Sequence, residues 1–147
     1  MLTRVRQLLP SYVHELKPRD AYRLWAEHYP PYAHNLLMEV EQHAVLDLLP
    51  AVRHKRVLDL ACGTGRYTRI LSERGARPVA LDFSFEMLAR DPNHSPRAQA
   101  DMLTLPLQDA SVEVIVCGVI GIDDGFKIAD EFHGALVEPR HARCAAQ

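Results

Sequence analysis

Acidic residues around a glycine-rich turn are the part of this sequence best suited to chemistry. The turn is "DLACGTG", residues 59–65, in which Gly63 and Gly65 follow Asp59. Asp82 and Asp101 stand at the ends of two further predicted strands. In an open parallel sheet, ligands bind beyond the carboxyl ends of the strands, where glycines let the backbone come close and an acid accepts hydrogen bonds from ribose hydroxyls. The pattern predicts a pocket for an adenosine with positive charge nearby, in which a side chain at Gly65 would obstruct the ligand.

Two other nucleotide-binding motifs fit this turn less well. A dinucleotide fingerprint has a third glycine where this chain has Thr68, and Asp59 would repel a pyrophosphate. A phosphate-binding loop needs Gly-Lys-Ser/Thr at the start of its helix, and "GRYT" does not supply it. The turn alone is weak evidence, and its combination with acids at strand ends is what favours the adenosine pocket.

The elements that must position these residues alternate between strands and helices. Asn35, as N-cap, and the spacing of Leu37, Val40, Ala44 and Leu48 predict an amphipathic helix with one apolar face. The predicted strands are 56–61, 78–83, 97–102 and 112–122, and the predicted helices are 20–29, 35–49, 66–76 and 84–90. Such alternation implies parallel strands joined by right-handed crossovers, and the nearly unbroken apolar run at 112–122 is typical of a central strand. The expected fold class is α/β.

At this point a family resemblance is plain. The segments "VLDLACGTGRYTRIL", "VALDFSFEML", "ADMLTLPL" and "VEVIVCGVI" resemble, in order, the cofactor motifs of class I S-adenosylmethionine-dependent methyltransferases of the small-molecule type 11 group. "YRLWAEHY" and "NLLMEVEQ" resemble that group's N-terminal helices, so the resemblance covers about residues 22–121. It implies a Rossmann-like three-layer parallel sheet, S-adenosyl-L-methionine as cofactor, and methyl transfer to a small-molecule acceptor. It also implies an N-terminal helical segment that acts as a cofactor lid (1–55), a cofactor-binding core (56–122) and a short atypical tail (123–147).

The resemblance implies roles for the residues of the turn. Asp59, Ala61, Gly63 and Gly65 would form the loop under the methionine moiety, with Asp59 near its ammonium group. Asp82 would hold the ribose.

Further roles follow for residues beyond the turn. Phe83 and Met87 would pack on the adenine, and Asp101 with the backbone of Met102 would bind the adenine edge. Cys117 would end the fourth strand beside the sulfonium. From the N-terminal helices, Tyr22 and Tyr29 would lie over the cofactor as part of the lid.

Simpler structural interpretations stay open for several of these residues. Asp59 could interact with the dipole of the following helix, and Met87 could belong to the core. The aromatic stripe that contains Tyr22 and Tyr29 could be core packing instead of a lid. Cys117 is interpreted as a small buried hydrophobic residue and not as a reactive thiol.

Composition excludes several other functions. The net charge of −2 and isoelectric point near 6.4 provide no basic field for nucleic acid. No apolar stretch reaches the roughly 20 residues of a membrane span, and the start lacks a secretory signal, so a cytoplasmic protein is expected. The three cysteines and eight histidines show no metal-ligand spacing, and the histidines are expected at the surface.

The end of the chain is unlike the family. Its last residues, "GIDDGFKIADEFHGALVEPRHARCAAQ", replace the remaining strands of the seven-stranded family sheet, although Ile128, Phe132, Ala135 and Leu136 have helical spacing. The expected protein is therefore the cofactor-binding half of a methyltransferase, and no general base is assigned. The alternative is a truncated or non-catalytic cofactor-binding or interaction subunit that does not turn over alone. The edge of the fourth strand is expected to pair with another chain, in self-association or with a partner subunit.

Overall fold

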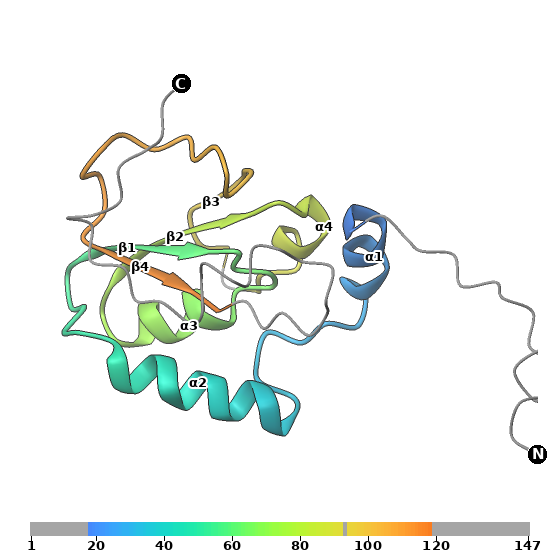
Figure 1. The fold of residues 1–147 in the computed structure, drawn as a ribbon, viewed down its shortest axis with the longest axis horizontal. Coiled ribbons are helices and arrows are strands. Elements are labelled where there is room, and N and C mark those ends of the chain that lie inside the picture. The colour runs from blue at the N-terminus through green and yellow to red at the C-terminus, as the bar shows by residue number, and fades with distance from the viewer. Residues whose placement is uncertain (1–17, 93, 119–147) are drawn as a thin grey trace, which may run out of the picture.

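The computed structural model describes residues 18–92 and 94–118 (Figure 1). Helices and strands alternate along most of this part of the chain, as the sequence predicts. In chain order they are α1 (Pro18–Trp25), α2 (Leu36–Leu48), β1 (Arg56–Leu60), α3 (Arg66–Glu73), β2 (Arg77–Asp82), α4 (Phe85–Leu88), β3 (Arg97–Gln99) and β4 (Val114–Cys117). The expected tail, 123–147, and the end of the expected fourth strand lie outside the described residues.

The strands form one parallel sheet in the order β3-β2-β1-β4, which confirms the α/β prediction. β1 lies between β2 and β4, with Leu58 opposite Val79 on one side and Ile115 on the other. Parallel neighbours cannot be joined by a tight turn, so each connection crosses the sheet and the carboxyl ends of all four strands meet at one edge. This carboxyl edge lies on the right of Figure 1, close to α1 and α4.

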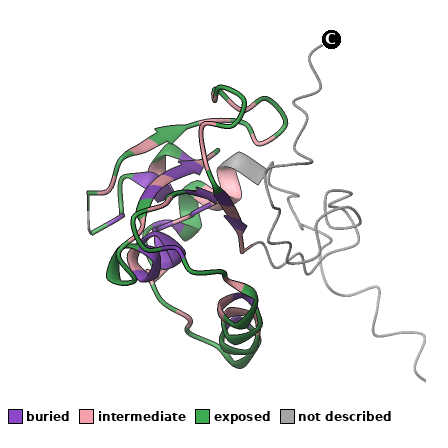
Figure 2. Cartoon of the chain, turned by 90° about the vertical axis from the view of Figure 1, so that its left-hand side faces the viewer, coloured by how far each residue is buried: buried purple, intermediate pink, exposed green. Residues whose placement is uncertain are grey.

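One hydrophobic core joins the sheet to α2 and α3 (Figure 2). In this core Val57 of β1 and Val116 of β4 are 0% and 1% exposed, and they pack with Leu71 of α3 and Val45 of α2. In Figure 1 α3 lies between the sheet and α2. Helix α2 thus shares the core of the strands.

The buried face of α2 differs from the predicted one. The side chain of Asn35 accepts a hydrogen bond from the Met38 amide and caps the helix as predicted. However, the exposed fractions of Leu37, Val40 and Leu48 are 46%, 59% and 64%, so the predicted apolar face points away from the core. The buried face instead carries Met38 and Val45 and also the polar Glu41, which is turned inward by partners on α3.

Those partners form the Glu41 cluster, which consists of Glu41, Arg66 and Tyr67. Arg66 Nη2 and the Tyr67 hydroxyl donate to the two carboxylate oxygens of Glu41, each at 2.8 Å. Arg66 Nη1 also donates to the Met38 carbonyl at 3.1 Å, and its guanidinium carbon lies 4.5 Å from the centre of the Tyr67 ring. Arg66 is only 7% exposed, so its charge depends on these contacts. The helical spacing of apolar residues does not indicate that the inward face of α2 carries a charged residue, Glu41, paired with Arg66.

No helix in residues 18–92 and 94–118 has the length and apolar character to cross a membrane. Within the same ranges no group of histidine, cysteine and carboxylate side chains is placed to hold a metal ion, and His28, His34, His43, His54 and His94 are exposed as expected.

Candidate cofactor-binding site

The glycine-rich turn leaves β1 through left-handed backbone conformations. Ala61, Gly63 and Gly65 have φ values of 56°, 57° and 88°, and Gly65 directly precedes α3 as its N-cap. A left-handed alanine is strained, and such strain is typical of backbone held in place for function. The glycine spacing therefore serves the sharp change of direction from strand to helix.

The two glycines face different surroundings. A Cβ atom built on Gly63 meets nothing within 4 Å, whereas one on Gly65 would lie 3.0 Å from Oδ1 of Asp91. Asp91 is 3% exposed and pairs with Arg97 at 3.3 Å. The positive φ of Gly65 and the nearby Asp91 side chain both favour glycine at position 65, and open space lies over Gly63. That a side chain at Gly65 would also obstruct the ligand stays a prediction.

Asp59 is the last residue but one of β1 and is fully enclosed, with 1% exposed. Its Oδ2 accepts a hydrogen bond from the Thr68 hydroxyl on α3. Its Oδ1 is buried and has no hydrogen-bond partner among the described residues. Burial, with a smaller contribution from the charge of Asp82, raises the pKa of Asp59 to about 7, although the hydroxyl and backbone amide of Thr68 and the charge of Arg66 act in the opposite direction. A buried carboxylate with an unused oxygen fits a site for a cationic group.

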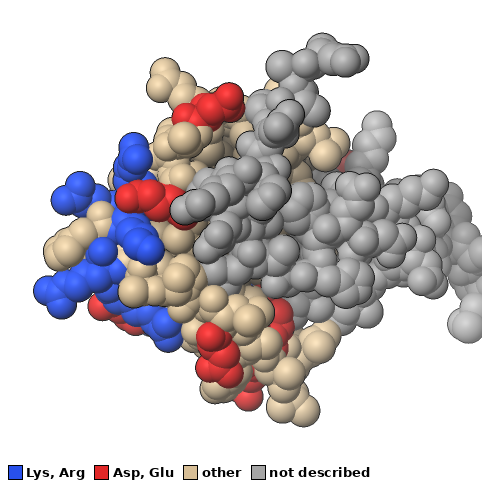
Figure 3. All heavy atoms as spheres, turned by 60° about the vertical axis from the view of Figure 1, so that its left-hand side comes forward, with Lys and Arg blue, Asp and Glu red and all other residues tan. Residues whose placement is uncertain are grey.

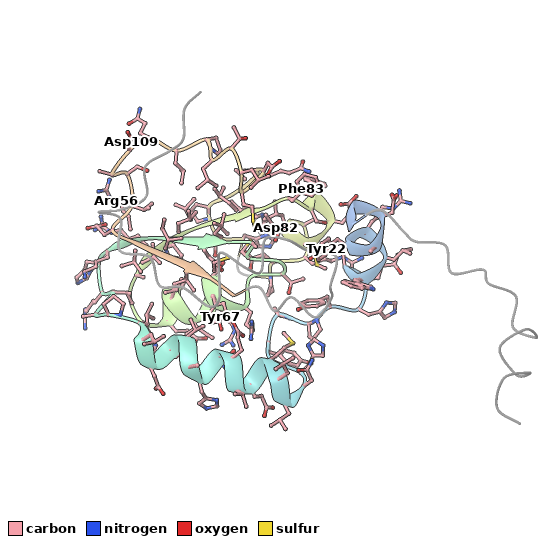
Figure 4. All side chains as sticks on the ribbon, viewed as in Figure 1. Tyr22, Arg56, Tyr67, Asp82, Phe83 and Asp109 are labelled. Atoms are coloured by element: carbon pink, nitrogen blue, oxygen red, sulfur yellow. The ribbon has the colours of Figure 1, made fainter. Side chains whose placement is uncertain are left out.

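Asp82 ends β2 and reaches back to the turn. Its Oδ2 accepts from the Gly63 amide at 2.7 Å and its Oδ1 from the Ser84 amide at 2.8 Å. Burial raises the pKa of Asp82, against these backbone hydrogen bonds. Each carboxylate oxygen has two lone pairs, so both oxygens retain capacity to accept from a diol. Figure 4 shows Asp82, Phe83 and Tyr22 together at the carboxyl edge, far from Arg56.

The predicted lid residues lie at this same edge. Tyr22 and Tyr29 are partly buried, and burial raises the pKa of both hydroxyl groups. The negative charge of Asp82 adds to the upward shift of the Tyr22 pKa, so that hydroxyl lies within the electric field of the Asp82 carboxylate. The segment between the two helices is fastened to the turn, because the buried Thr64 hydroxyl donates to the Pro30 carbonyl at 3.2 Å.

The residues predicted around the adenine are placed differently from one another. Phe83 is 44% exposed and offers a ring face, and its carbonyl accepts from the Gln99 amide group at 2.8 Å. Met87 is 2% exposed and belongs to the core beneath α4, as its alternative interpretation states. Of the two side chains, only that of Phe83 is exposed enough to contact a ligand.

The residues predicted beyond the adenine lie on the loops and strand that follow. Asp101 lies two residues beyond the end of β3, exposed, and its side chain accepts from the Leu103 amide at 2.9 Å in a turn that also contains Met102. Cys117 ends β4 as predicted, opposite Leu60, and it is partly buried.

Two residues of this site were not predicted from the sequence. Thr68 orients Asp59, and Thr64 binds the N-terminal segment. The available signal was the threonine at the position of a third dinucleotide-motif glycine, because a hydroxyl in the first turn of the helix that follows an acid-bearing strand can donate a hydrogen bond back to that acid.

Comparison with known proteins identifies the family. Residues 58–132 match the family model described as a methyltransferase domain, Methyltransf_11. The chain belongs to this family of class I S-adenosylmethionine-dependent methyltransferases, which the parallel sheet and the acid-lined glycine turn also indicate.

Curated relatives match part of their own length. The chain is 37% identical over 85 residues to the malonyl-[acyl-carrier protein] O-methyltransferase of Enterobacter lignolyticus, covering 56% of this chain and 34% of the relative. It is 44% identical over 94 residues to the demethylmenaquinone methyltransferase of Corynebacterium urealyticum, covering 63% of this chain and 37% of the relative. The chain thus spans about a third of the length of these relatives.

Solved structures show the same fold. DhpI, in its complex with SAM and HEP, is 30% identical with a TM-score of 0.54, covering 67% of this chain and 47% of DhpI. A methyltransferase complexed with the Haloferax volcanii Trm112 activator is 25% identical with a TM-score of 0.56, covering 69% and 48% of the two chains.

Proposed function

We propose that this chain binds S-adenosylmethionine at the carboxyl edge and carries the cofactor-binding half of a methyltransferase that acts on a small-molecule acceptor. The observation that carries the proposal is Asp59 Oδ1, a buried carboxylate oxygen without a partner among the described residues. An unpaired buried acceptor costs free energy, and a cationic donor bound there would offset that cost. The methionine part of the cofactor carries such a donor in its ammonium group.

The remaining contacts of the cofactor follow from the geometry of the turn. The open space over Gly63 would admit the ligand backbone, and Asp82 would accept hydrogen bonds from the ribose hydroxyls. Phe83 would cover one side of the adenine, with the Asp101 turn at its edge, and Tyr22 and Tyr29 would close the site from the N-terminal segment. These assignments fit a nucleoside that carries positive charge. They do not fit a pyrophosphate, because its negative charge would be repelled by the two acids.

When bound, S-adenosylmethionine supplies an activated methyl group on its sulfonium. The residues of this chain hold and orient the donor, and the partly buried tyrosines restrict water at the carboxyl edge. The two groups of relatives bear the names of different acceptors, malonyl-[acyl-carrier protein] and demethylmenaquinone, so the proposal extends to a small-molecule acceptor without naming one.

Calorimetric titration with S-adenosylhomocysteine, the demethylated product, tests the proposal. Asp82→Ala should weaken binding by about 1.5–3 kcal/mol, the range for hydrogen bonds to a charged group. Asp109→Ala is the matched control, because Asp109 is exposed and lies at the opposite end of the molecule (Figure 4). Tighter binding of NADH than of S-adenosylhomocysteine, or equal losses in the two variants, would contradict the proposal.

A second candidate function is a cofactor-binding subunit that turns over only with a partner. Within the described residues β4 is the last strand of the sheet and pairs only with β1. The similar chain solved in complex with the Haloferax volcanii Trm112 methyltransferase activator is bound to a second protein, which supports this candidate. We expect self-association or a partner subunit at the β4 edge, which sedimentation velocity and a methyl-transfer assay on small acceptors would test. A stable monomer with steady turnover would exclude this candidate.

A further inference from the structure

The amino edge of the sheet, opposite the candidate cofactor site, brings together two loops that are distant in sequence. One loop joins α2 to β1 and the other joins α3 to β2. The His54 amide donates to the Gly75 carbonyl at 2.7 Å, and the Arg77 amide donates to the Lys55 carbonyl at 2.8 Å. A Cβ atom on Gly75 would lie 3.3 Å from Cγ of Arg53, so the stem of that arginine crosses close to the second loop. The two loops therefore form one surface.

This surface concentrates positive charge. Arg53, Arg74 and Arg77 are exposed and Lys55 is partly exposed, and we call these four residues the basic edge. Figure 3 shows Lys and Arg side chains gathered at this end of the molecule. The register of the sheet adds Arg56, which is paired directly opposite Arg77. A chain with a net charge of −2 thus carries a local excess of cations at the end remote from Asp59 and Asp82.

The four cations of the basic edge make no ion pair with any described acid. Glu113 pairs with Arg56 at 3.3 Å, and Glu73 pairs with Arg69 at 2.7 Å, so both neighbouring acids are already engaged. The pKa of Glu113 is lowered, first by the Arg56 amide and in smaller part by the charges of Arg56 and Lys55. Like charges held together by backbone hydrogen bonds repel one another, and an acidic partner would relieve that repulsion.

A groove of about 310 Å³ opens between two of these cations. Its lining surface is about equally polar and apolar: Arg53 and Arg74 line it together with Leu49, Pro50, Ala51 and Val52. The apolar part can take one apolar side chain, and the two guanidinium groups can take carboxylates beside it.

We propose that the basic edge and its groove dock an acidic amphipathic segment of a partner protein, with an apolar side chain in the groove and carboxylates on Arg53 and Arg74. Cations distributed over two loops exceed what one small anion can contact, which favours a macromolecule. The apolar residues in the lining favour a protein segment over a nucleic acid, whose backbone would offer only phosphate and sugar. The partner would dock without covering the carboxyl edge, so docking and cofactor binding are compatible.

The test is fluorescence anisotropy of the full chain with a labelled helical peptide in which glutamates flank a stripe of leucines. The variant Arg53→Glu/Arg74→Glu should lose at least about tenfold in peptide affinity, since reversed charges at a docking site repel the ligand. The control, Arg23→Glu/Arg90→Glu, makes the same change of net charge at exposed sites away from the basic edge and should lose about threefold or less. Circular dichroism melts establish that both variants are folded, and Arg53→Gln/Arg74→Gln replaces the reversal variant if that one is not.

Further arms of the experiment separate the partner classes. Replacing the peptide leucines by glutamine should weaken binding, and raised salt should weaken it further. Equal losses in the two double variants would overturn the proposal, as would full affinity of the glutamine peptide. Tighter binding of duplex DNA or of phosphatidylserine vesicles than of the peptide would also overturn it, in favour of a nucleic acid or a membrane surface.

Discussion

At the scale of single residues, Asp59 links protonation to both stability and ligand affinity. Its pKa in the folded chain is about 7, above the ordinary value of 3.8, because the carboxyl is buried. The folded state therefore prefers the protonated form. Its contribution to stability is complete below the ordinary value and is lost as pH rises through about 7. Urea unfolding should show this decline between about pH 4 and pH 7. Asp59→Asn should reduce the decline, and an unchanged pH slope in that variant would contradict the assignment.

Cofactor affinity should depend on pH in the opposite direction. A bound ammonium group favours the ionised carboxylate, so binding releases a proton from Asp59. Affinity for S-adenosylhomocysteine should then rise by about tenfold between about pH 6 and pH 8. Calorimetry in two buffers of different ionisation enthalpy measures the released proton. Thr68→Val should displace the profile to higher pH because it removes a hydrogen bond to the carboxylate, whereas Thr68→Ser keeps the hydroxyl and should not.

The two glycines of the turn should respond differently to the same substitution. Both have positive φ, so alanine at either position costs about 1–2 kcal/mol of backbone strain. Gly63→Ala adds only that strain to folding, because its Cβ meets open space, but it should weaken cofactor binding. Gly65→Ala also presses on Asp91 and should lower the free energy of unfolding further. Urea unfolding measures the effect on stability, and calorimetry measures the effect on cofactor binding. A smaller loss of stability in Gly65→Ala than in Gly63→Ala would contradict this prediction.

At the scale of elements, the Glu41 cluster fastens α2 to the start of α3. Glu41→Ala removes the counter-charge of the buried Arg66 and should cost about 3–5 kcal/mol of stability. Tyr67→Phe removes one hydrogen bond and should cost about 1–1.5 kcal/mol. Glu39→Ala, an exposed change on the same helix, should stay within about 0.5 kcal/mol. Chemical denaturation ranks the three, and an equal cost for Glu39 and Glu41 would mean that the cluster is not what holds α2.

The elements also show what the sequence could predict. Alternating strands and helices predicted the parallel sheet, and Asn35 predicted the start of α2, because local capping and apolar periodicity determine both. The inward face of α2 was predicted wrongly, since the helix packs Met38 and Val45 on the core and pairs Glu41 with Arg66 of α3, while Leu37, Val40 and Leu48 are exposed. Gly63 and Gly65 look equivalent in sequence, and only the position of Asp91 tells them apart. The inward face of α2 and the difference between the two glycines depend on contacts between residues distant in the chain, and the periodicity of the sequence does not indicate such contacts.

At the scale of the whole molecule, the sheet should open from its sides. β1 pairs along its length with both β2 and β4, and Val57 and Leu58 are 0% exposed. β3 has three residues, pairs only with β2 among the described strands, and is mostly exposed. Amide hydrogen exchange should therefore be slowest in β1 and much faster in β3. Faster exchange in β1 than in β3 would show that the sheet is not the stable centre of the fold.

The contact between Tyr67 and Gly118 constrains how this sequence can diverge. A Cβ atom on Gly118 would overlap the Tyr67 ring and lie 2.9 Å from Oε1 of Glu41, so no side chain fits there while the ring is in place. Among homologues the two positions should covary: a ring at position 67 should occur with glycine at 118, and a larger residue at 118 only with a small one at 67. A larger residue at position 118 alone would collide with the Tyr67 ring, so the permitted path begins with a smaller residue at position 67.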